Sequence, residues 1–375
     1  MQRYLDFNAT CPPLEAALEA QANAARQACG NPSSLHWAGR NARRALDDAR
    51  DALAAHVGVE SGSVVFTSGG TEANNLAISG YCAAQKTGHI ITTAIEHPAV
   101  LQPVARLQEA GWQVTHIKPL KNGAIRADDV AAAMREDTRL VAVMAANNET
   151  GVKQPVEKIG ALCRERGIAF MVDAVQALGK GKVSLRDWQA DFVSLSAHKI
   201  GGPRGVGALI VRRGVSLSEI APGGGQERKR RSGTENVPGI AGFAAALGGI
   251  DFNDYKSMRE SFESELTASI PDATVFGIGA ERTPNTSMVC IPGLDGETLL
   301  MQLDLAGFAV ASGSACSSGK REPSHVLLAM GASQEQARSS IRVSFGPGNS
   351  QQDAGALVAE LVRIRQRLRG MAGAA

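Results

Sequence analysis

The chain has 375 residues, a formal net charge of +2 and a hydrophobic content of 44%. This length exceeds what one hydrophobic core usually serves, so two domains are expected. The balanced charge gives no reason to expect nucleic acid or an anionic membrane as a partner. No stretch approaches the ~20 apolar residues of a membrane span, and the first ten residues lack the features of a signal peptide. We therefore expect a cytoplasmic protein whose cysteines are free thiols.

Between residues 63 and 195, short apolar runs alternate with helical patterns. A helix is predicted over about 156–166, with Gly167 as the glycine that follows its end. Continuous apolar strands separated by helices are typical of a mainly parallel sheet that is covered on both faces. Strands are predicted at 63–67, 140–145, 168–172 and 191–195.

From about residue 254 the pattern changes. A long charged helix carries apolar residues at helical spacing from Met258 to Ile270, short strands are expected near 274–276 and 287–291, and a last helix follows around 357–368. The sequence thus predicts an α/β fold with a smaller α+β domain. The large domain is expected over 15–253, and the small domain over 1–14 and 254–375.

The loop at 68–71 follows a predicted strand and precedes a helix. Its glycines would let the backbone approach an anion, and the helix N-terminus offers free N–H groups and a positive dipole. Capping is, however, the commoner role of residues such as Ser68 and Thr71 before a helix. Taken alone, this loop is a weak indication of a phosphate site.

Two ionisable residues directly follow later strands. Asp173 either caps the next turn or stays ionised beside a protonated ring nitrogen. Lys199 follows a buried strand, which is unusual for a lysine unless it is neutralised, paired or covalently modified. A Schiff base would meet that condition, and Ser196 and His198 are suitable phosphate donors.

Cys316 lies in the loop 313–319, which is otherwise made of glycine, serine and alanine. Cys163 and Cys290 lie in apolar runs, whereas a thiol on such a loop suits a nucleophile that moves to and from a substrate. His97 follows a β-like segment. Pyridoxal phosphate needs an anion cradle, an acid at its pyridine nitrogen and a Schiff-base lysine. The combination of the 68–71 loop, Asp173 and Lys199 therefore predicts that cofactor.

Motifs spread over nearly the whole chain carry a family resemblance. The sequence resembles the cysteine desulfurases, within the class V aminotransferase-like group of fold-type I pyridoxal-phosphate enzymes. The short cysteine motif is similar to that of the nitrogenase-associated and housekeeping branch. The matching stretches are YLDFNAT, GNPSSLH, FTSGGTEANN, EHPAV, NNETG, VDAVQ, SAHK, GGGQERKRRSGT, NTSM, SGSACSSG, EPSHVL and IRVSFG.

The resemblance implies a role for each residue of a cofactor site. Lys199 would form the Schiff base, Asp173 would hold the pyridine nitrogen, and Gln176 would hydrogen-bond the ring hydroxyl. His97 would stack on the ring and handle protons, and Asn148 would lie beside cofactor and substrate. The residues expected to bind the phosphate are Gly70, Thr71, Ser196 and His198, with Thr234 reaching the phosphate of a neighbouring subunit in a homodimer.

The resemblance also implies the reaction. Arg342, together with Asn31, would hold the carboxylate of L-cysteine, and a planar guanidinium suits that task. Cys316 would take the sulfur as a persulfide, release L-alanine and pass the sulfur to an iron–sulfur scaffold or a thiolation carrier. No resident metal site is expected. Cys316 would contact an iron–sulfur cluster on a partner only transiently. His97, Lys320 or Arg321 would favour the thiolate.

Other interpretations stay open. A lyase acting on selenocysteine or cysteine sulfinate depends less on an attacking thiol, and a non-catalytic sulfur-transfer scaffold would need neither Lys199 nor Asp173. Nothing in the sequence indicates the second side-chain site of a transaminase. The chain also departs from the family pattern at Phe7, at Cys11 and in its short C-terminal end.

Overall fold

The computed structural model describes residues 2–312 and 322–372, with side chains up to residue 368. Its larger sheet has seven strands in a mixed but mostly parallel arrangement, which confirms the predicted α/β fold. The exception is β8, which is antiparallel to both of its neighbours. Across the sheet the strands are β2 (Val64–Thr67), β8 (Gly207–Val211), β7 (Phe192–Ser196), β6 (Ala169–Asp173), β5 (Thr138–Met144), β3 (His89–Thr93) and β4 (Gln113–Ile117).

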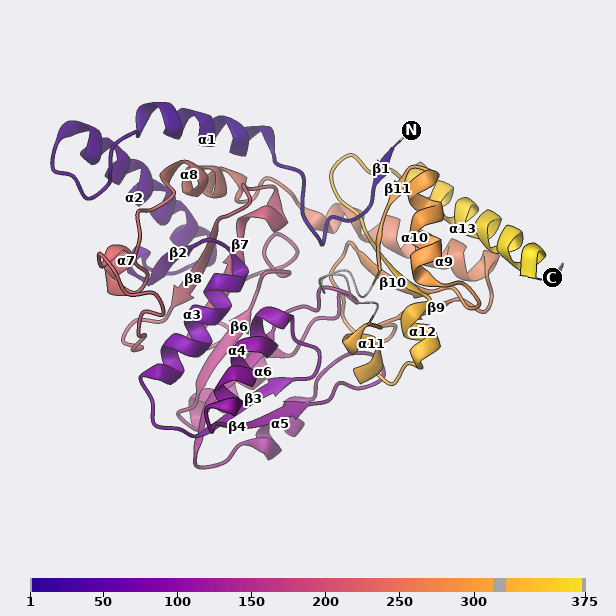
Figure 1. Cartoon of the computed structure of the whole chain (residues 1–375), viewed down its shortest axis with the longest axis horizontal. Helices are drawn as coiled ribbons and strands as arrows, with labels where there is room; N and C mark the ends of the chain where they lie inside the picture. Colours follow the sequence, from indigo (N-terminus) through magenta and orange to yellow (C-terminus); the bar gives the residue numbers. More distant parts are fainter. Residues whose placement is uncertain (1, 313–321, 373–375) are drawn as a thin grey trace.

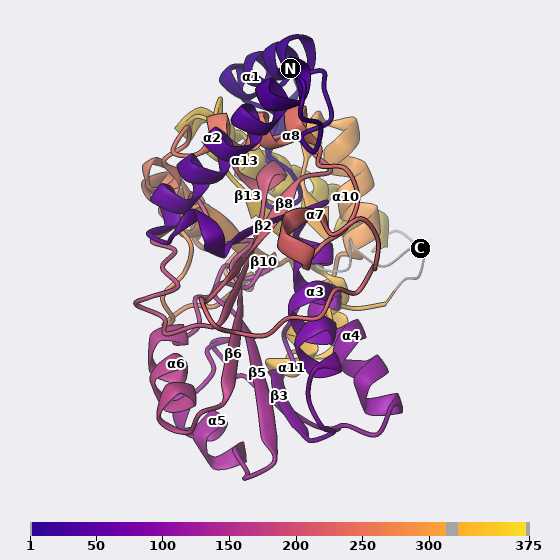
Figure 2. The same cartoon turned by 90° about the vertical axis from the view of Figure 1, so that its left-hand side faces the viewer.

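Helices cover both faces of this sheet (Figure 2). Helices α3 (Gly70–Ala83) and α4 (Pro98–Glu109) lie on one side, and α5 (Ala127–Ala133) and α6 (Val156–Glu165) lie on the other. Successive strand residues point to opposite faces. In β6, Met171 therefore packs in the cluster beneath α3 and α4, while Phe170 and Val172 join the other cluster. This double burial explains why the central strands are continuous apolar runs rather than alternating ones.

Helices α1 (Glu15–Gln27), α2 (Trp37–Val57) and α8 (Val237–Ala246) pack together near β2, β7 and β8 (Figure 1). The remaining short helices near this sheet are η1 (Ser61–Ser63), η2 (Ala197–Ile200) and α7 (Gln226–Lys229). Within the described residues, no helix combines the length and apolarity that crossing a membrane would require.

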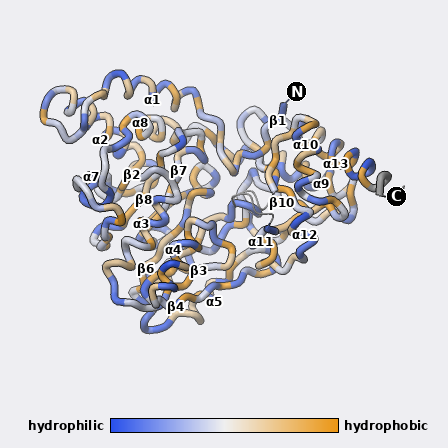
Figure 3. Tube along the Cα trace, in the orientation of Figure 1, coloured by the Kyte–Doolittle hydropathy of each residue, from blue (hydrophilic) through white to orange (hydrophobic). Residues whose placement is uncertain are grey.

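A second, antiparallel sheet is built from the later part of the chain, to the right in Figure 1. Its strands, in spatial order, are β12 (Ala311–Ser312), β13 (Ser340–Ser344), β10 (Thr286–Cys290) and β9 (Thr274–Phe276). Apolar strand positions, orange in Figure 3, pack against helices α9 (Lys256–Ser269), α10 (Gly296–Leu305) and α13 (Gln351–Ala372). Shorter elements are η3 (Phe252–Tyr255), α11 (His325–Ala329) and α12 (Gln334–Arg338).

The first residues run between the two sheets. Strand β1 (Arg3–Tyr4) pairs with β11 (Phe308–Ala309), and Leu5 is buried in the core of the second sheet. A few residues later, the backbone N–H of Cys11 donates to the carbonyl of His198 at 2.8 Å. This segment therefore contacts both parts of the molecule. The division into 15–253 and 1–14 with 254–375 stays a prediction.

The predicted element boundaries largely agree with the structure. Helix α6 ends as expected, and Gly167 follows with a left-handed φ of 65° that glycine adopts easily.

The segment that follows α7 leads to Thr234, and α7 itself has left-handed φ angles at Glu227, Arg228 and Lys229. A buried pair fixes this strained segment, because Arg50 donates to both carboxylate oxygens of Glu227 at 2.6 and 2.8 Å.

Candidate active site

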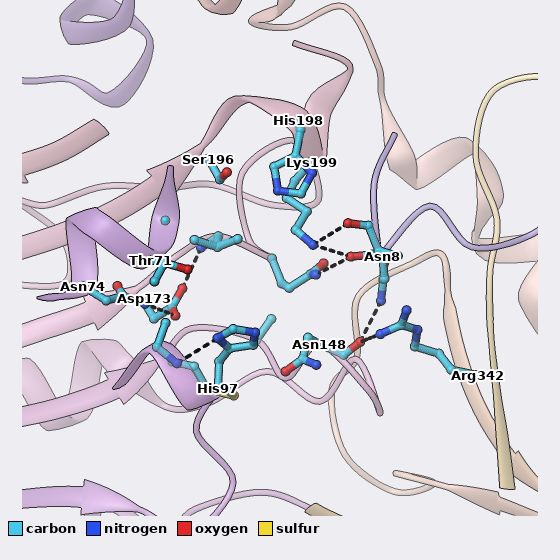
Figure 4. Close-up of a pocket in the computed structure, with 17 residues that line it drawn as sticks. Asn8, Thr71, Asn74, His97, Asn148, Asp173, Ser196, His198, Lys199 and Arg342 are labelled. Atoms are coloured by element: carbon cyan, nitrogen blue, oxygen red, sulfur yellow. Dashed lines mark hydrogen bonds between the residues drawn. The ribbon is translucent and has the colours of Figure 1, made fainter. Parts of the chain in front are cut away.

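A cavity of about 260 Å³ opens at the carboxyl ends of β6 and β7 (Figure 4). Parallel strands commonly bring ligand-binding residues together at this edge of a sheet. The cavity also reaches residue 8 of the N-terminal segment and Arg342 of β13. The site residues predicted from sequence that line it are Gly70, Thr71, His97, Asn148, Asp173, Gln176, Ser196, His198, Lys199 and Arg342.

Two predicted residues, Asn31 and Thr234, do not line this cavity, and the structure does not describe a third. Cys316 lies outside the described residues. Asn31 is exposed between α1 and α2, where its side-chain oxygen accepts a hydrogen bond from the backbone N–H of Ser33 at 2.9 Å. Thr234 is exposed in the segment after α7. Within a single chain, Asn31 therefore does not reach the cavity that contains Arg342.

The start of α3 is shaped to receive an anion. The helix begins at Gly70, and its N-cap residue, Gly69, supplies no side-chain cap. Simple capping by Ser68 or Thr71 is therefore wrong. A Cβ atom at position 70 would come within 2.6 Å of Val175 Cγ2, so only glycine keeps the backbone open here. Free N–H groups and the helix dipole at this end favour negative charge.

Two hollows meet beside this helix end. Gly70, Thr71, Ser196 and His198 line the cavity and also a more open hollow that reaches Arg204. Burial, with the charges of Lys199 and Arg204, lowers the pKa of His198 to about 4. The His198 imidazole is therefore neutral near pH 7, and Thr10 Oγ1 lies 3.1 Å from its Nδ1. These polar groups fit a phosphate.

Asp173 ends β6 and is only 6% exposed. Its Oδ1 accepts from the Val175 N–H at 3.0 Å, which is the turn-capping contact considered from the sequence. Its Oδ2 accepts from Asn74 Nδ2 at 2.7 Å. No lysine or arginine in the described residues forms a salt bridge with this carboxylate. A buried carboxylate in a cavity without such a partner fits a cationic ring nitrogen.

Lys199 enters the cavity from η2, directly after β7. Its Nζ donates to the carbonyl oxygens of Asn8 at 2.6 Å and Ala9 at 2.8 Å (Figure 4). The N-terminal segment therefore holds the lysine amine. Sequence reasoning did not single out Asn8, although it lies in the YLDFNAT stretch that carried part of the resemblance.

His97 is the N-cap residue of α4, and its Nδ1 accepts from the Ala99 N–H at 3.0 Å. A ring nitrogen that accepts this bond carries no proton, so the neutral ring holds its proton on Nε2. Burial is the main cause that lowers the pKa of His97. The charges of Lys199 and His325 lower it further, and Asp173 opposes them. Proton exchange by His97 is thus confined to Nε2.

Arg342 approaches from the opposite side of the cavity. Its Nη2 donates to Asp6 Oδ1 at 2.7 Å, and its Nη1 donates to the carbonyl oxygen of Asn148 at 3.0 Å. Arg342 is only 4% exposed. Among the described residues, its Nε has no hydrogen-bond partner. A buried cation with unused donor capacity suits an anionic ligand group.

Glu96 is a buried acid that sequence reasoning missed. Its Oε1 accepts from Thr93 Oγ1 at 2.6 Å and from the Met144 N–H at 3.0 Å. Its Oε2 has no partner among the described residues. Burial is the main cause that raises the pKa of Glu96 to about 8, and the charge of Asp173 adds to it. The EHPAV stretch pointed to its neighbour, but nothing in the sequence marked Glu96 as protonated.

We expect Glu96→Gln to change how stability depends on pH. The unfolded carboxyl has a pKa of about 4.3. The folded state therefore binds the proton more tightly, and this contribution to stability is lost as pH rises towards 8. The loss is at most about 1.4 kcal/mol per pH unit. A glutamine at position 96 does not ionise. The free energy of unfolding of Glu96→Gln should therefore increase relative to that of the wild type as the pH rises from 5 to 8.

Urea unfolding at several pH values measures this difference. Glu165→Gln is the matched control, because Glu165 is exposed on α6 and its replacement should give a pH-independent difference. A constant difference between Glu96→Gln and the wild type would contradict the protonated state of Glu96.

The fold and this site together define the fold-type I class of pyridoxal-phosphate enzymes. A mostly parallel sheet carries the carboxylate and the lysine on adjacent strand ends, beside a helix N-terminus. The chain belongs to the class-V aminotransferase family, whose sequence profile matches residues 3–357. Members of this family depend on pyridoxal phosphate.

The relatives are consistent in name. The chain is 42% identical to a putative cysteine desulfurase IscS 1 of Bacillus subtilis, over 97% of this chain and 99% of the relative. It is 38% identical to the cysteine desulfurase IscS of Dictyoglomus turgidum, over 98% and 95% of the two chains. These relatives place the chain with the cysteine desulfurases of the family, as the sequence motifs predicted.

Solved structures agree. A NifS-like protein superposes with a TM-score of 0.90 at 33% identity, covering 98% of this chain and all of the other. A NifS-like protein from Rickettsia africae gives a TM-score of 0.86 at 31% identity, with the same coverage. SspA in complex with cysteine gives a TM-score of 0.81 at 32% identity, covering 93% of this chain and all of that one.

Proposed function

We propose that this protein is a pyridoxal-phosphate-dependent cysteine desulfurase, which converts L-cysteine to L-alanine and takes the sulfur on Cys316. The observation that carries the proposal is the buried Asp173 carboxylate, which has no salt-bridge partner among the described residues and lines the same cavity as Lys199. The names of the relatives support the substrate.

In the proposed cofactor site, polar residues that line the cavity bind different parts of the cofactor. Asp173 would hold a proton on the pyridine nitrogen, and Gln176 would donate to the ring hydroxyl. When bound, the cofactor supplies an electron-withdrawing ring that stabilises negative charge at the substrate Cα. The groups that would hold its phosphate are Gly70, Thr71, Ser196 and His198, which share the two adjoining hollows.

Lys199 would attach the cofactor and, once its amine is free, remove the Cα proton of the substrate. The carbonyls of Asn8 and Ala9 accept hydrogen bonds from Nζ and so leave its lone pair available when the amine is neutral. His97 would stack on the ring and exchange protons through Nε2, because Nδ1 already accepts from Ala99. Asn148 would lie beside cofactor and substrate.

Arg342 would bind the substrate carboxylate. Its guanidinium lines the cavity on the side away from Asp173 (Figure 4), which would place the substrate Cα between Arg342 and Lys199. Asp6 balances part of the Arg342 charge in the absence of substrate. A substrate carboxylate would add a second anionic partner to the same guanidinium.

The described residues on either side of 313–321 support a role for Cys316. Ala311, just before this segment, pairs with Arg342 across β12 and β13. His325, just after it, has its Nε2 within 3.0 Å of the carbonyl of Glu96. Ala311 thus lies beside the proposed carboxylate-binding residue, and His325 contacts the residue next to His97. The Cys316 thiolate would attack the substrate sulfur while the bond between Cβ and that sulfur breaks and leaves its electron pair with carbon. Protonation at carbon would then give L-alanine, and Cys316 would hold the sulfur as a persulfide. An acceptor thiolate would then take the outer sulfur and restore the Cys316 thiol.

Purified holoenzyme incubated with L-cysteine is expected to yield alanine, and sulfide when a thiol reductant is present. Cys316→Ala should lose alanine formation from cysteine, because no thiolate remains to accept the sulfur. Mass spectrometry should find an added sulfur on the peptide that contains Cys316 in the wild type.

The alternatives give different results in the same assay. Cys316→Ala that still releases alanine from cysteine would contradict the persulfide step. Activity only towards selenocysteine or cysteine sulfinate would favour the related lyase. A wild type without alanine formation and without a borohydride-reducible chromophore would favour the non-catalytic scaffold.

We further infer that the active form is a homodimer. Asn31 and Thr234 are exposed in the single chain, and next to Asn31 the apolar side chains of Leu35 and Trp37 are 91% and 67% exposed. A second copy would cover these side chains and bring Thr234 to its neighbour's phosphate site. An active enzyme that sediments as a monomer would contradict this. The acceptor would be an iron–sulfur scaffold or a thiolation carrier in the cytoplasm.

A further inference from the structure

Lys180 is a lysine buried without an acidic partner. It lies four residues after Gln176 and is only 2% exposed. Its Nζ donates to Asn8 Oδ1 and to Gln176 Oε1, both at 2.5 Å, and lies 5.4 Å from the ring centroid of Phe252. Among the described residues, it forms no salt bridge with a carboxylate. Burying a lysine in this way is costly, and its position next to the cavity suggests a functional reason.

The Lys180 amine determines how the side-chain amides of Asn8 and Gln176 are oriented. A lysine ammonium only donates, so the two amides must turn their oxygens towards it. The Gln176 nitrogen is thereby turned away and donates to the Asn8 carbonyl at 2.9 Å. An amide nitrogen has two N–H groups, so a second one remains for the cavity that Gln176 lines.

The same contact orients Asn8, together with a longer hydrogen bond of 3.4 Å from Asn285 Nδ2 to Asn8 Oδ1. With its Oδ1 on Lys180, the Asn8 Nδ2 donates to Thr286 Oγ1 at 2.8 Å and to the Asn148 carbonyl at 3.2 Å. The backbone carbonyl of Asn8 then accepts from both Gln176 Nε2 and Lys199 Nζ. Figure 4 shows Asn8 between Lys199 and Arg342. Lys180 is thus connected through one residue to the proposed Schiff-base lysine.

We propose that Lys180 is a positioning residue, which fixes the Gln176 amide so that its second N–H faces the ring hydroxyl of the cofactor and keeps the Asn8 carbonyl in place for Lys199. This inference rests on the proposed cofactor site. It assigns Lys180 no direct contact with cofactor or substrate, and Lys180 does not line the cavity.

The two contacts of Lys180 do not require its charge. Burial is the main cause that lowers its pKa well below the usual value, and Lys199 and Arg342 add to the effect while Cys11 opposes it. A neutral amine still carries two N–H groups, which is enough for the two amide oxygens. Both contacts can therefore persist in either protonation state.

The consequence is spectroscopic. An N–H donated to the ring oxygen withdraws negative charge from it, and that charge would otherwise stabilise a proton on the adjacent Schiff-base nitrogen. Without Lys180, the Gln176 amide is free to turn its oxygen to the cavity and the donor is lost. Lys180→Met should therefore raise the pH midpoint of the holoenzyme's visible absorbance change by about one unit.

A double-mutant cycle tests this route. Gln176→Ala alone should give a similar upward shift, and Lys180→Met combined with Gln176→Ala should give the shift of Gln176→Ala rather than the sum. Lys182→Met is the matched control two residues away, because Lys182 is 80% exposed and pairs with Asp187. Its midpoint should equal that of the wild type. A wild-type midpoint in Lys180→Met, or additive shifts, would overturn the proposal.

A packing role would lower the melting temperature without moving the absorbance midpoint, so both are measured. If Lys180→Met yields no folded holoenzyme, Lys180→Gln replaces it, since an amide still offers two N–H donors. Its shift should be smaller than that of Gln176→Ala, and an equal or larger shift would overturn the proposal. A wild type without a reducible chromophore would instead contradict the proposed function, and a normal wild-type chromophore with an unchanged Lys180→Met midpoint would contradict this inference alone.

Discussion

Replacement of Lys199 by alanine is expected to lower kcat for alanine formation by about 10³-fold or more, because the base that removes the Cα proton is lost. Among the described residues, Lys199 is the only lysine that lines the cavity, so no neighbouring amine stands ready to replace it. The borohydride-reducible link between cofactor and protein should vanish as well. Amino-acid analysis of the products and the mass of the reduced protein measure the two effects.

Lys182→Ala is the control for this substitution. The Lys182 side chain is exposed, pairs with Asp187 and does not line the cavity. The activity and the reducible link of Lys182→Ala should therefore match those of the wild type. Circular dichroism of Lys199→Ala should remain unchanged, since the hydrogen bonds from Nζ to the carbonyls of Asn8 and Ala9 lie at the cavity rather than within a helix or strand. Wild-type kcat in Lys199→Ala would contradict the proposed chemistry.

Asp173→Asn is expected to reduce kcat by about 10²- to 10³-fold, because the charge that holds the pyridine proton is removed while the shape is kept. The substitution should be tolerated structurally. Asn74 Oδ1 is buried without a partner among the described residues, so a rotated Asn74 amide can accept from the new side chain. The contact from the Val175 N–H to the side-chain oxygen can also remain. Weaker cofactor binding should accompany the slower reaction.

Asp191→Asn separates this effect from a loss of stability. Asp191 is also buried near a strand, but it accepts from the Phe170 N–H and pairs with Arg212, and it does not line the cavity. Its replacement should lower the melting temperature and leave the cofactor dissociation constant unchanged. Asp173→Asn should show the opposite pattern. Equal cofactor affinity in Asp173→Asn and the wild type would argue against a contact with the pyridine nitrogen.

The residues that sequence reasoning found share a property. Gly70, Asp173 and Lys199 each lie at or close to the end of an element whose apolar pattern is visible in the chain, so their positions in space follow from the topology of a parallel sheet. Gly70 shows a further constraint, because the side chain of Val175 leaves no room for a Cβ atom there. The alternative of a simple side-chain cap does not hold, because Gly69 rather than a polar side chain precedes the helix.

The residues that were missed act through partners far away in sequence. Asn8 contacts Lys180 and Asn148, which are more than a hundred residues away along the sequence. No local sequence pattern predicts such contacts. Asn74 has a weak local signal, since a polar residue one turn after Gly70 would lie on the buried face of α3. Glu96 and Lys180 look like ordinary charged residues until their burial is known.

The sequence alone determined the α/β class, the cofactor lysine and acid as candidates, and the family, because apolar periodicity and short motifs are local properties. Only the tertiary structure decided that the N-terminal segment closes the cavity, that His97 is restricted to Nε2, and that Lys180 orients two amides. Protonation and hydrogen-bond direction depend on burial and on neighbours from several elements, and these are fixed only when the chain has folded.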